Sequence, residues 1–200
     1  MYMGDVKSKT FLDTNASSAT YVAAAARPTS TFTLANSSFG TNNARKITAT
    51  TAGTGDNGKT ITIVGKDHNN EDATEVITLT GSAETSSGTT TAFLTITSAT
   101  VSAQPAANVS LGMTADVFGS IFQGRTRVRQ VNAESGGSIG SVLFRNGSLT
   151  GTALLTVRTG ATAGDVNTVN IPQDGILYKD GAFVTFDETQ CNSATVYFDG

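Results

Sequence analysis

One stretch of the chain has the spacing of a phosphate-binding loop. Residues 53–60 read Gly-Thr-Gly-Asp-Asn-Gly-Lys-Thr and match the Walker A pattern at every position that the pattern fixes. In such a loop the backbone N–H groups and the lysine hold phosphates, and a helix follows whose N-terminus faces the anion. The residues that follow here, 60–64, alternate β-branched side chains and predict a strand instead. We therefore expect a turn between two strands, without nucleotide binding.

The only histidine of the chain, His68, lies in a polar stretch that is typical of a connection between strands. Any Ser-His-Asp arrangement would need this side chain, and an exposed turn is a poor place for a general base. The same stretch carries four side chains with oxygen ligands for Ca²⁺: Asp67, Asn69, Glu71 and Asp72. The glycine and the full ligand series of an EF-hand loop are missing. We expect a solvated turn with, at most, a weak cation site.

Covalent and metal chemistry find little support elsewhere. Cys191 is the only cysteine, so no disulfide can form within the chain, and no His/Cys cluster has metal-ligand spacing. We expect Cys191 in a loop before the last strand, without a basic neighbour that would lower its pKa. The carboxylates are scattered and include no facing pair of the kind that a glycosidase needs. The sequence predicts no catalytic, cofactor-binding or metal-binding residue, and no enzymatic activity.

Three arginines, Arg125, Arg127 and Arg129, alternate along one predicted strand and would line one of its faces. Nucleic-acid surfaces of this kind interleave aromatic residues and lie in a wider basic region, and neither feature occurs here. The net charge of −3 also argues against a phosphate-binding surface. We expect a protein contact or a solvated edge, and no nucleic-acid partner.

The composition favours thin β-sheets. Hydrophobic residues make up 38% of the chain and charged residues 14%, against roughly 45–50% and 25% in typical globular domains. Threonine is the commonest residue and 21 glycines are present. β-Branched threonine suits a pleated surface with one wet face, and glycine supplies the positive φ angles of tight turns.

From residue 31 onward, apolar and polar residues alternate with a period of two, as in strands with one buried face. The predicted strands are 31–35, 45–50, 59–64, 74–80, 92–97, 97–103, 108–112, 126–131, 140–145, 153–158, 168–171, 176–178, 183–186 and 195–198. Turn signals separate them at 146–147, 173–175 and 179–181. The fold class is therefore all-β, with two small β-sandwich- or barrel-like modules in tandem at 31–115 and 120–200.

Residues 1–30 differ from the rest and are expected to form an N-terminal arm, extended or partly helical. The alanine-rich residues 16–26 could form a short helix, capped by Thr14 or Asn15 and stopped by Pro28. No basic region followed by an apolar run predicts a signal peptide. The longest apolar stretch, 22–26, is far shorter than the roughly 20 residues of a membrane span, so no membrane partner is expected.

Both modules resemble known β modules. Residues 46–111, with Gly-Lys-Thr-Ile-Thr-Ile-Val-Gly at 58–65, Glu-Val-Ile-Thr-Leu at 75–79, Phe93 and the stretch 101–112, resemble Ig-like modules of tailed-bacteriophage virion proteins. Residues 140–147, 154–157, 171–178 and 194–198 resemble a second small β module of the same phage proteins. Together these segments cover most of residues 45–200. The resemblance implies a structural role in the virion and carries over no catalytic residue.

The expected function is that of a non-enzymatic capsid decoration or cement protein that stabilises the head shell. A tail, neck or fibre-base component is the alternative, and a cell-surface adhesin module comes third. The expected partners are the major capsid protein or other virion proteins, with assembly in the host cytoplasm into the virion. We also expect a homo-oligomer, with a trimer favoured, that docks through the arm and one sheet edge. Residues 7–14 would then add as a strand to a neighbouring protein.

Overall fold

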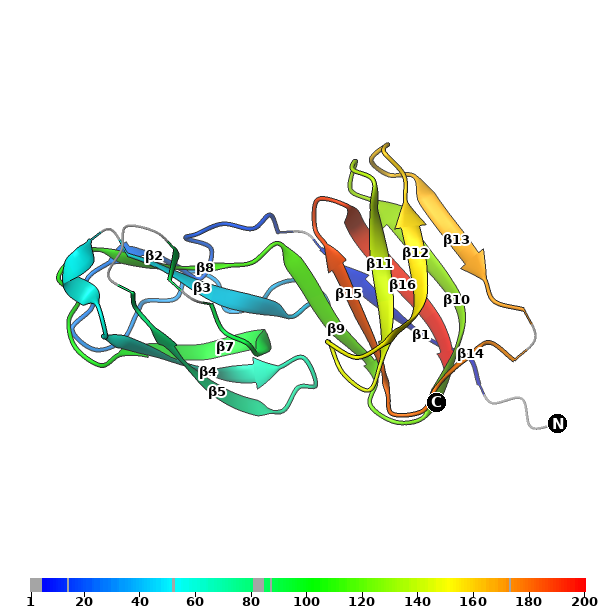
Figure 1. The fold of residues 1–200 in the computed structure, drawn as a ribbon, viewed down its shortest axis with the longest axis horizontal. Helices are drawn as coiled ribbons and strands as arrows, with labels where there is room; N and C mark the ends of the chain where they lie inside the picture. The colour runs from blue at the N-terminus through cyan, green and yellow to red at the C-terminus, as the bar shows by residue number, and fades with distance from the viewer. Residues whose placement is uncertain (1–4, 14, 52, 81–84, 87, 173) are drawn as a thin grey trace. The chain divides into compact units, whose positions relative to one another are not determined.

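The computed structural model describes residues 5–13, 15–51, 53–80, 85–86, 88–172 and 174–200. Within these residues the regular structure is β-strand, apart from one 3₁₀ turn, η1, at Thr54–Asp56 (Figure 1). The predicted all-β class is confirmed, and all strand pairs are antiparallel. In the described part of the chain, no helix has the length and hydropathy of a membrane span.

The chain divides into two compact units, each with its own core. The discontinuous unit consists of Met1–Asn15, Gly40–Asn43 and Asp116–Gly200. The inserted unit consists of Ala16–Phe39 and Ala44–Ala115. The chain therefore leaves the discontinuous unit after its first strand and returns for good only at Asp116. This differs from the expected order of an arm at 1–30 followed by modules at 31–115 and 120–200, because the first 15 residues belong with the last 85.

The inserted unit is a two-layered β structure. Its strands are β2 (Ala23–Ala26), β3 (Arg45–Thr51), β4 (Thr60–Asp67), β5 (Asp72–Thr78), β6 (Thr85–Ser86), β7 (Ala92–Val101) and β8 (Val109–Met113). They are hydrogen-bonded in the order β2-β8-β3-β7-β4-β5, and β6 pairs with β3. The path bends where β3 meets β7, so β2, β8 and β3 lie over β7, β4 and β5 (Figure 1).

Alternation along the strands fills the core of the inserted unit. Ile61 and Ile63 of β4 are fully buried. Both faces of β5 carry apolar residues, and Ile77 is the buried one, whereas Val76 is 53% exposed. The other large side chains of this core are Phe32, Phe39, Ile47, Leu79, Phe93, Ile96 and Leu111.

The discontinuous unit is a sandwich of two sheets. Its strands are β1 (Lys7–Leu12), β9 (Asp116–Phe122), β10 (Thr126–Ser135), β11 (Gly140–Asn146), β12 (Ala153–Thr159), β13 (Val166–Asn170), β14 (Ile176–Tyr178), β15 (Ala182–Asp187) and β16 (Cys191–Asp199). One sheet has the order β1-β16-β10-β13, with β14 also paired to β10, and the other has the order β12-β11-β15-β9.

Two of the predicted turns, at 146–147 and 179–181, contact each other in this unit. Gly147 and Gly181 both have positive φ angles, 84° and 103°, which glycine adopts without steric cost. The side-chain oxygen of Asn146 accepts hydrogen bonds from the backbone N–H groups of Lys179 (2.8 Å) and Asp180 (3.3 Å). Two turns that are far apart in sequence therefore fix each other.

The segment predicted to be an arm is part of the fold. Lys7–Leu12 pairs with β16 of its own chain, so this segment is a strand of the fold, and Thr14 lies outside the described residues. Phe11 explains this docking, because its fully buried ring lies directly against Gly119 of β9. The Lys9 ammonium also donates to the Ser120 carbonyl at 2.7 Å. A single large apolar side chain thus anchors a strand whose other residues are mostly exposed.

Four further expectations differ from the structure. Residues 16–26 form no α-helix in their described part and supply β2 instead, and residues 31–35 form only one bridge, Thr31↔Thr100. Residues 116–120, expected to link the modules, belong to the buried strand β9. Residues 92–97 and 97–103 were separate predicted strands and are joined in one, β7. In each case long-range pairing overrides the local pattern.

Candidate functional site

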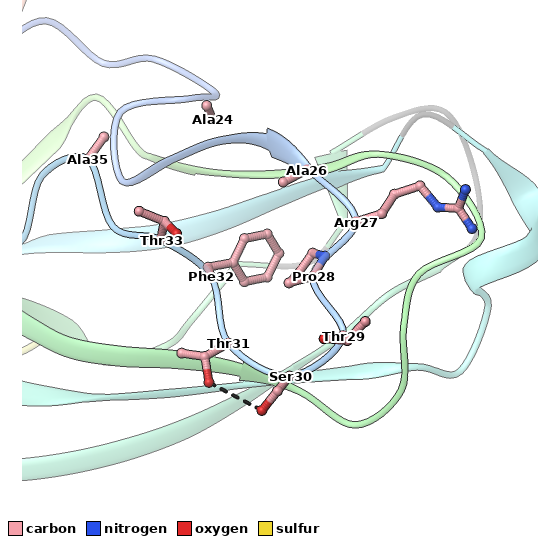
Figure 2. Close-up of a pocket in the computed structure, with 10 residues that line it drawn as sticks. All are labelled: Ala24, Ala26, Arg27, Pro28, Thr29, Ser30, Thr31, Phe32, Thr33 and Ala35. Atoms are coloured by element: carbon pink, nitrogen blue, oxygen red, sulfur yellow. Dashed lines mark hydrogen bonds between the residues drawn. The ribbon is translucent and has the colours of Figure 1, made fainter.

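The inserted unit contains a groove with a volume of about 610 Å³. It lies between β2 and the run of residues 29–35 that turns back beside it (Figure 2). Its lining consists of Ala24, Ala26, Arg27, Pro28, Thr29, Ser30, Thr31, Phe32, Thr33 and Ala35. The volume is in the range of ordinary ligand sites.

The two sides of the groove belong to different layers of the sandwich. β2 is the last strand of its layer and pairs with β8 on one side only. The opposite run is held on β7, because Phe32 N–H donates to the Ala99 carbonyl (2.9 Å) and Val101 N–H donates to the Ser30 carbonyl (2.8 Å). At the far end, Ala35 N–H donates to the Val22 carbonyl at 2.8 Å and closes the groove.

The groove has an apolar floor and a polar rim. The Phe32 ring is directed between the two runs and is only 4% exposed (Figure 2). The hydroxyls of Ser30 and Thr31 lie 3.4 Å apart on the rim. At one end, the Arg27 Nε donates to the Pro105 carbonyl at 2.9 Å, and no described carboxylate forms an ion pair with this guanidinium. The arrangement can bind an apolar or extended ligand, and its lining includes no histidine, cysteine, lysine or carboxylate.

The segment that matches the Walker A pattern forms a turn whose polar side chains hydrogen-bond to other residues of the chain. Lys59, the residue that would hold phosphate, donates to the Asp56 carboxylate (2.9 Å) and to the Gln104 carbonyl (2.8 Å). The same carboxylate accepts hydrogen bonds from the N–H groups of Ala106 (2.5 Å) and Ala107 (3.1 Å). The strand β4 follows, as predicted. The lysine and the loop thus serve the packing of a turn against residues 104–107.

The charge of Asp56 is stabilised despite its burial. Burial by itself raises the pKa of a carboxyl group, but the Lys59 ammonium and the two backbone N–H groups outweigh it and hold the pKa of Asp56 at about 2. The ionised form is therefore the native form at neutral pH. Its role is structural, since the side chain is fully buried.

His68 lies at the tip of the β4–β5 hairpin, as expected, but its side chain is only 17% exposed, whereas a solvated side chain was predicted. Burial lowers the pKa of this imidazole, against the opposing effect of Asp67 and Glu71. The Asp67 carboxylate accepts hydrogen bonds from the N–H groups of Asn69 (2.8 Å) and Glu71 (2.9 Å), which shape the turn. Asp72 forms an ion pair with Lys66 at 2.9 Å. Asp67 and Asp72 thus have partners within the hairpin. Among the described residues, no group of three or more His, Cys, Asp or Glu side chains is placed to hold a metal ion.

Cys191 is placed differently from the prediction, because it begins β16 and is fully buried. Burial raises the pKa of its thiol to about 12. The thiol donates to the Ser193 carbonyl at 3.2 Å. A buried, protonated thiol is a packing group, not a nucleophile.

The arginine strand is only partly the continuous face that was predicted. A bulge of β10 lies between Val128 and Gln130, and the Arg129 guanidinium forms an ion pair with Asp199 at 2.6 Å. Arg125 and Arg127 line a second cavity of about 290 Å³, and Arg129 does not. Arg127 donates to the Asp174 carbonyl at 3.3 Å. The structure therefore brings two of the three arginines together.

The groove beside β2 was missed by the sequence analysis. Its residues were divided between the predicted arm and the predicted strand 31–35, so no pattern suggested that they face each other. Pro28, between four alanines and a polar run, is the one signal of a reversal at this place. Comparison with known proteins supplies no further guide: no protein-family model, curated protein or solved structure matches the chain.

Proposed function

We propose that this chain is a non-enzymatic structural protein of a tailed-phage virion and acts as a capsid decoration or cement protein. One observation carries the proposal: the segments that resemble phage virion modules coincide with the core strands of the two units. Residues 58–65 lie at β4, residues 140–147 at β11, and residues 194–198 within β16. The inserted unit would then be the Ig-like module of the pair.

The surface of the inserted unit suits contact with other protein. The outer face of the β4–β5 hairpin presents the cross-strand pairs Thr62↔Val76 and Val64↔Thr74. Val64 is 37% exposed and Val76 is 53% exposed. The ion pair Lys66–Asp72 (2.9 Å) lies at the end of the same face, so the apolar surface that a shell protein would cover is centred on these two valines.

The proposed cement role is mechanical. A cement protein contributes binding energy that holds neighbouring capsid proteins together, so it must bind in its folded form and remain folded under load. In the discontinuous unit, β1 and β16 pair along six residues each, so the first and last strands are joined laterally. Such pairing resists separation of the strand ends. We propose a homo-oligomer, a trimer, as the unit that docks on the major capsid protein.

The test uses the purified chain and phage particles that lack it. We expect the protein to co-sediment with the heads, to raise their temperature of disruption, and to occupy shell positions in a cryo-EM map. Val76→Lys should weaken this binding, whereas Val166→Lys, the same substitution at a valine of similar exposure on β13 of the other unit, should not. Density only at the neck, tail or fibre base would replace the decoration role with the alternative one. If the protein is absent from purified wild-type particles and does not bind to the particles that lack it, a virion role is refuted.

Sedimentation of the free and particle-bound protein tests the oligomeric state separately. A trimer is expected in at least one of the two. A monomer in both would remove the trimer from the proposal without affecting the virion role.

A further inference from the structure

We propose that the groove between β2 and residues 29–35 binds an extended peptide segment of a partner protein by β-strand addition. The groove alone carries this inference, which stands or falls independently of the virion role. The proposed segment has four to six residues, small side chains toward Phe32, and a carboxylate near Arg27. Strand addition gives affinity through backbone hydrogen bonds and specificity through alternate side chains.

The run opposite β2 has backbone groups that point into the groove. Phe32 N–H and the Ser30 carbonyl are both bonded to β7, on either side of the bridge Thr31↔Thr100. In an antiparallel ladder, the backbone groups of the residue between two such bonds point to the other side of the strand. The N–H and carbonyl of Thr31 therefore face the groove, and those of Thr33 follow by alternation. No backbone hydrogen bond among the described residues engages either threonine.

β2 completes an acceptor with two edges. It is a terminal strand of its layer, and Ala24 and Ala26 line the groove whereas Ala25 does not. Methyl groups on this side leave room for the side chains of an added strand. The Phe32 ring forms the floor, so alternate residues of the added strand would bury apolar surface there (Figure 2). An open edge of this kind is normally blocked by charge, proline or a covering segment.

Charge selects the partner's chemistry. Arg27 lies at one end of the groove and pairs with no described carboxylate, while its Nε is fixed on the Pro105 carbonyl at 2.9 Å. A guanidinium that is already oriented can donate hydrogen bonds to a carboxylate at little further entropic cost. The occupant should therefore be an acidic extended segment, not a basic one.

The probe is a library of hexapeptides with blocked ends, in which small residues alternate with varied ones. Selected peptides should carry Asp or Glu near one end and should lack a central proline, since proline donates no backbone hydrogen bond. We expect Kd values of about 1–300 μM by calorimetry, as short added strands give few contacts. On binding, hydrogen exchange of the Thr31 and Thr33 amides should slow. If no peptide of the library binds with a Kd below about 1 mM, the proposal is overturned.

A matched pair of variants locates the site. Ala26→Tyr fills the groove and should weaken binding at least about tenfold, whereas Ala25→Tyr, on the same strand but outside the lining, should change it less than about twofold. Equal effects of the two variants would refute the location. Both residues are exposed, so both variants should unfold at the temperature of the unmodified protein.

A double-mutant cycle tests the charge contact without relying on the tyrosine variants. Arg27→Gln should weaken binding of the acidic peptide about tenfold. The same variant should bind the peptide's Asp→Asn counterpart as the unmodified protein does. Equal losses with both peptides would refute the acidic specificity. Self-association that Ala26→Tyr abolishes, without any peptide, would identify a second copy of the chain as the occupant and overturn the assignment to a partner protein.

Discussion

Phe11 is the residue on which the discontinuous unit should depend most. Its ring is fully buried, and it comes from β1, a strand that the chain forms more than a hundred residues before β9 and β16. Replacement of a buried phenylalanine by alanine costs about 3–5 kcal/mol, because it removes apolar burial and leaves a cavity. A small domain has a free energy of unfolding of only about 5–15 kcal/mol. Phe11→Ala should therefore remove a large part of the stability of this unit.

Leu12→Ala is the matched control. Leu12 is the next residue of the same strand, points to the other face and is 38% exposed. Its truncation should cost no more than about 1 kcal/mol. Both variants keep the backbone pairing of β1 with β16, so the difference between them measures the burial of the Phe11 ring.

Hydrogen exchange measured by mass spectrometry assigns the loss to one unit. In Phe11→Ala, the amides of β16 should lose protection while those of β4, in the inserted unit, keep theirs. Urea denaturation gives the free energies. The reasoning is refuted if Phe11→Ala costs no more than Leu12→Ala, or if β4 loses protection to the same extent as β16. A chain without residues 1–12 should fail to form the unit, unlike a chain that loses a mere docking arm.

Three further predictions concern Gly119, Asp56 and Cys191. Gly119→Ala would place a Cβ 2.1 Å from the Phe11 ring, and should cost about 1–3 kcal/mol in urea denaturation unless the ring moves. The lowered pKa of Asp56 contributes about 2 kcal/mol to the free energy of unfolding; this contribution is present above pH 4 and is lost as the pH falls toward 2. Asp56→Asn should therefore be less stable at pH 7 and should lack this acid-dependent loss of stability. Cys191 should not react with a thiol reagent at pH 8 until urea unfolds the chain, so rapid reaction of the native protein would contradict its burial.

Strands were predictable where both faces of the pattern agreed with the burial. In β4 the alternation of Thr62 with Ile61 and Ile63 is sufficient, because one face is in the core and the other is wet. On β5 both faces carry apolar residues, so the sequence could not choose between Val76 and Ile77. The choice is made by the register with β4, which pairs Ile61 with Ile77.

Strands that depend on distant partners were not predictable. β1 buries one large apolar residue in six and lies in a segment of low hydrophobicity, and the strand that it pairs with is the last in the chain. β9 contains Gly119 and Ser120, which resemble a linker when read locally. Gly119 is there because the Phe11 ring occupies the space of a side chain. Each segment makes sense only in the presence of the other.

The candidate groove was invisible for a related reason. Sequence patterns report which side chains a strand buries, whereas the groove arises where β2 and residues 29–35 leave a space between two layers. Arg27 and Phe32 are an unremarkable pair in the sequence, five residues apart with Pro28 between them. Their relation comes from the hydrogen bonds that fix residues 30–32 on β7.

The insertion also constrains how the chain folds. Residues 16–115 contain the whole inserted unit, and only residues 40–43 within this range belong to the discontinuous unit, so the inserted unit can form as soon as its strands have been synthesised. The discontinuous unit cannot, because β1 must wait for β16 and the Phe11 ring must wait for β9. Closing so long a loop is slow, but a folded inserted unit shortens the flexible part of it. The early strand and the late strand are thereby brought into one cooperative structure, and the stability of the discontinuous unit depends on residues from both ends.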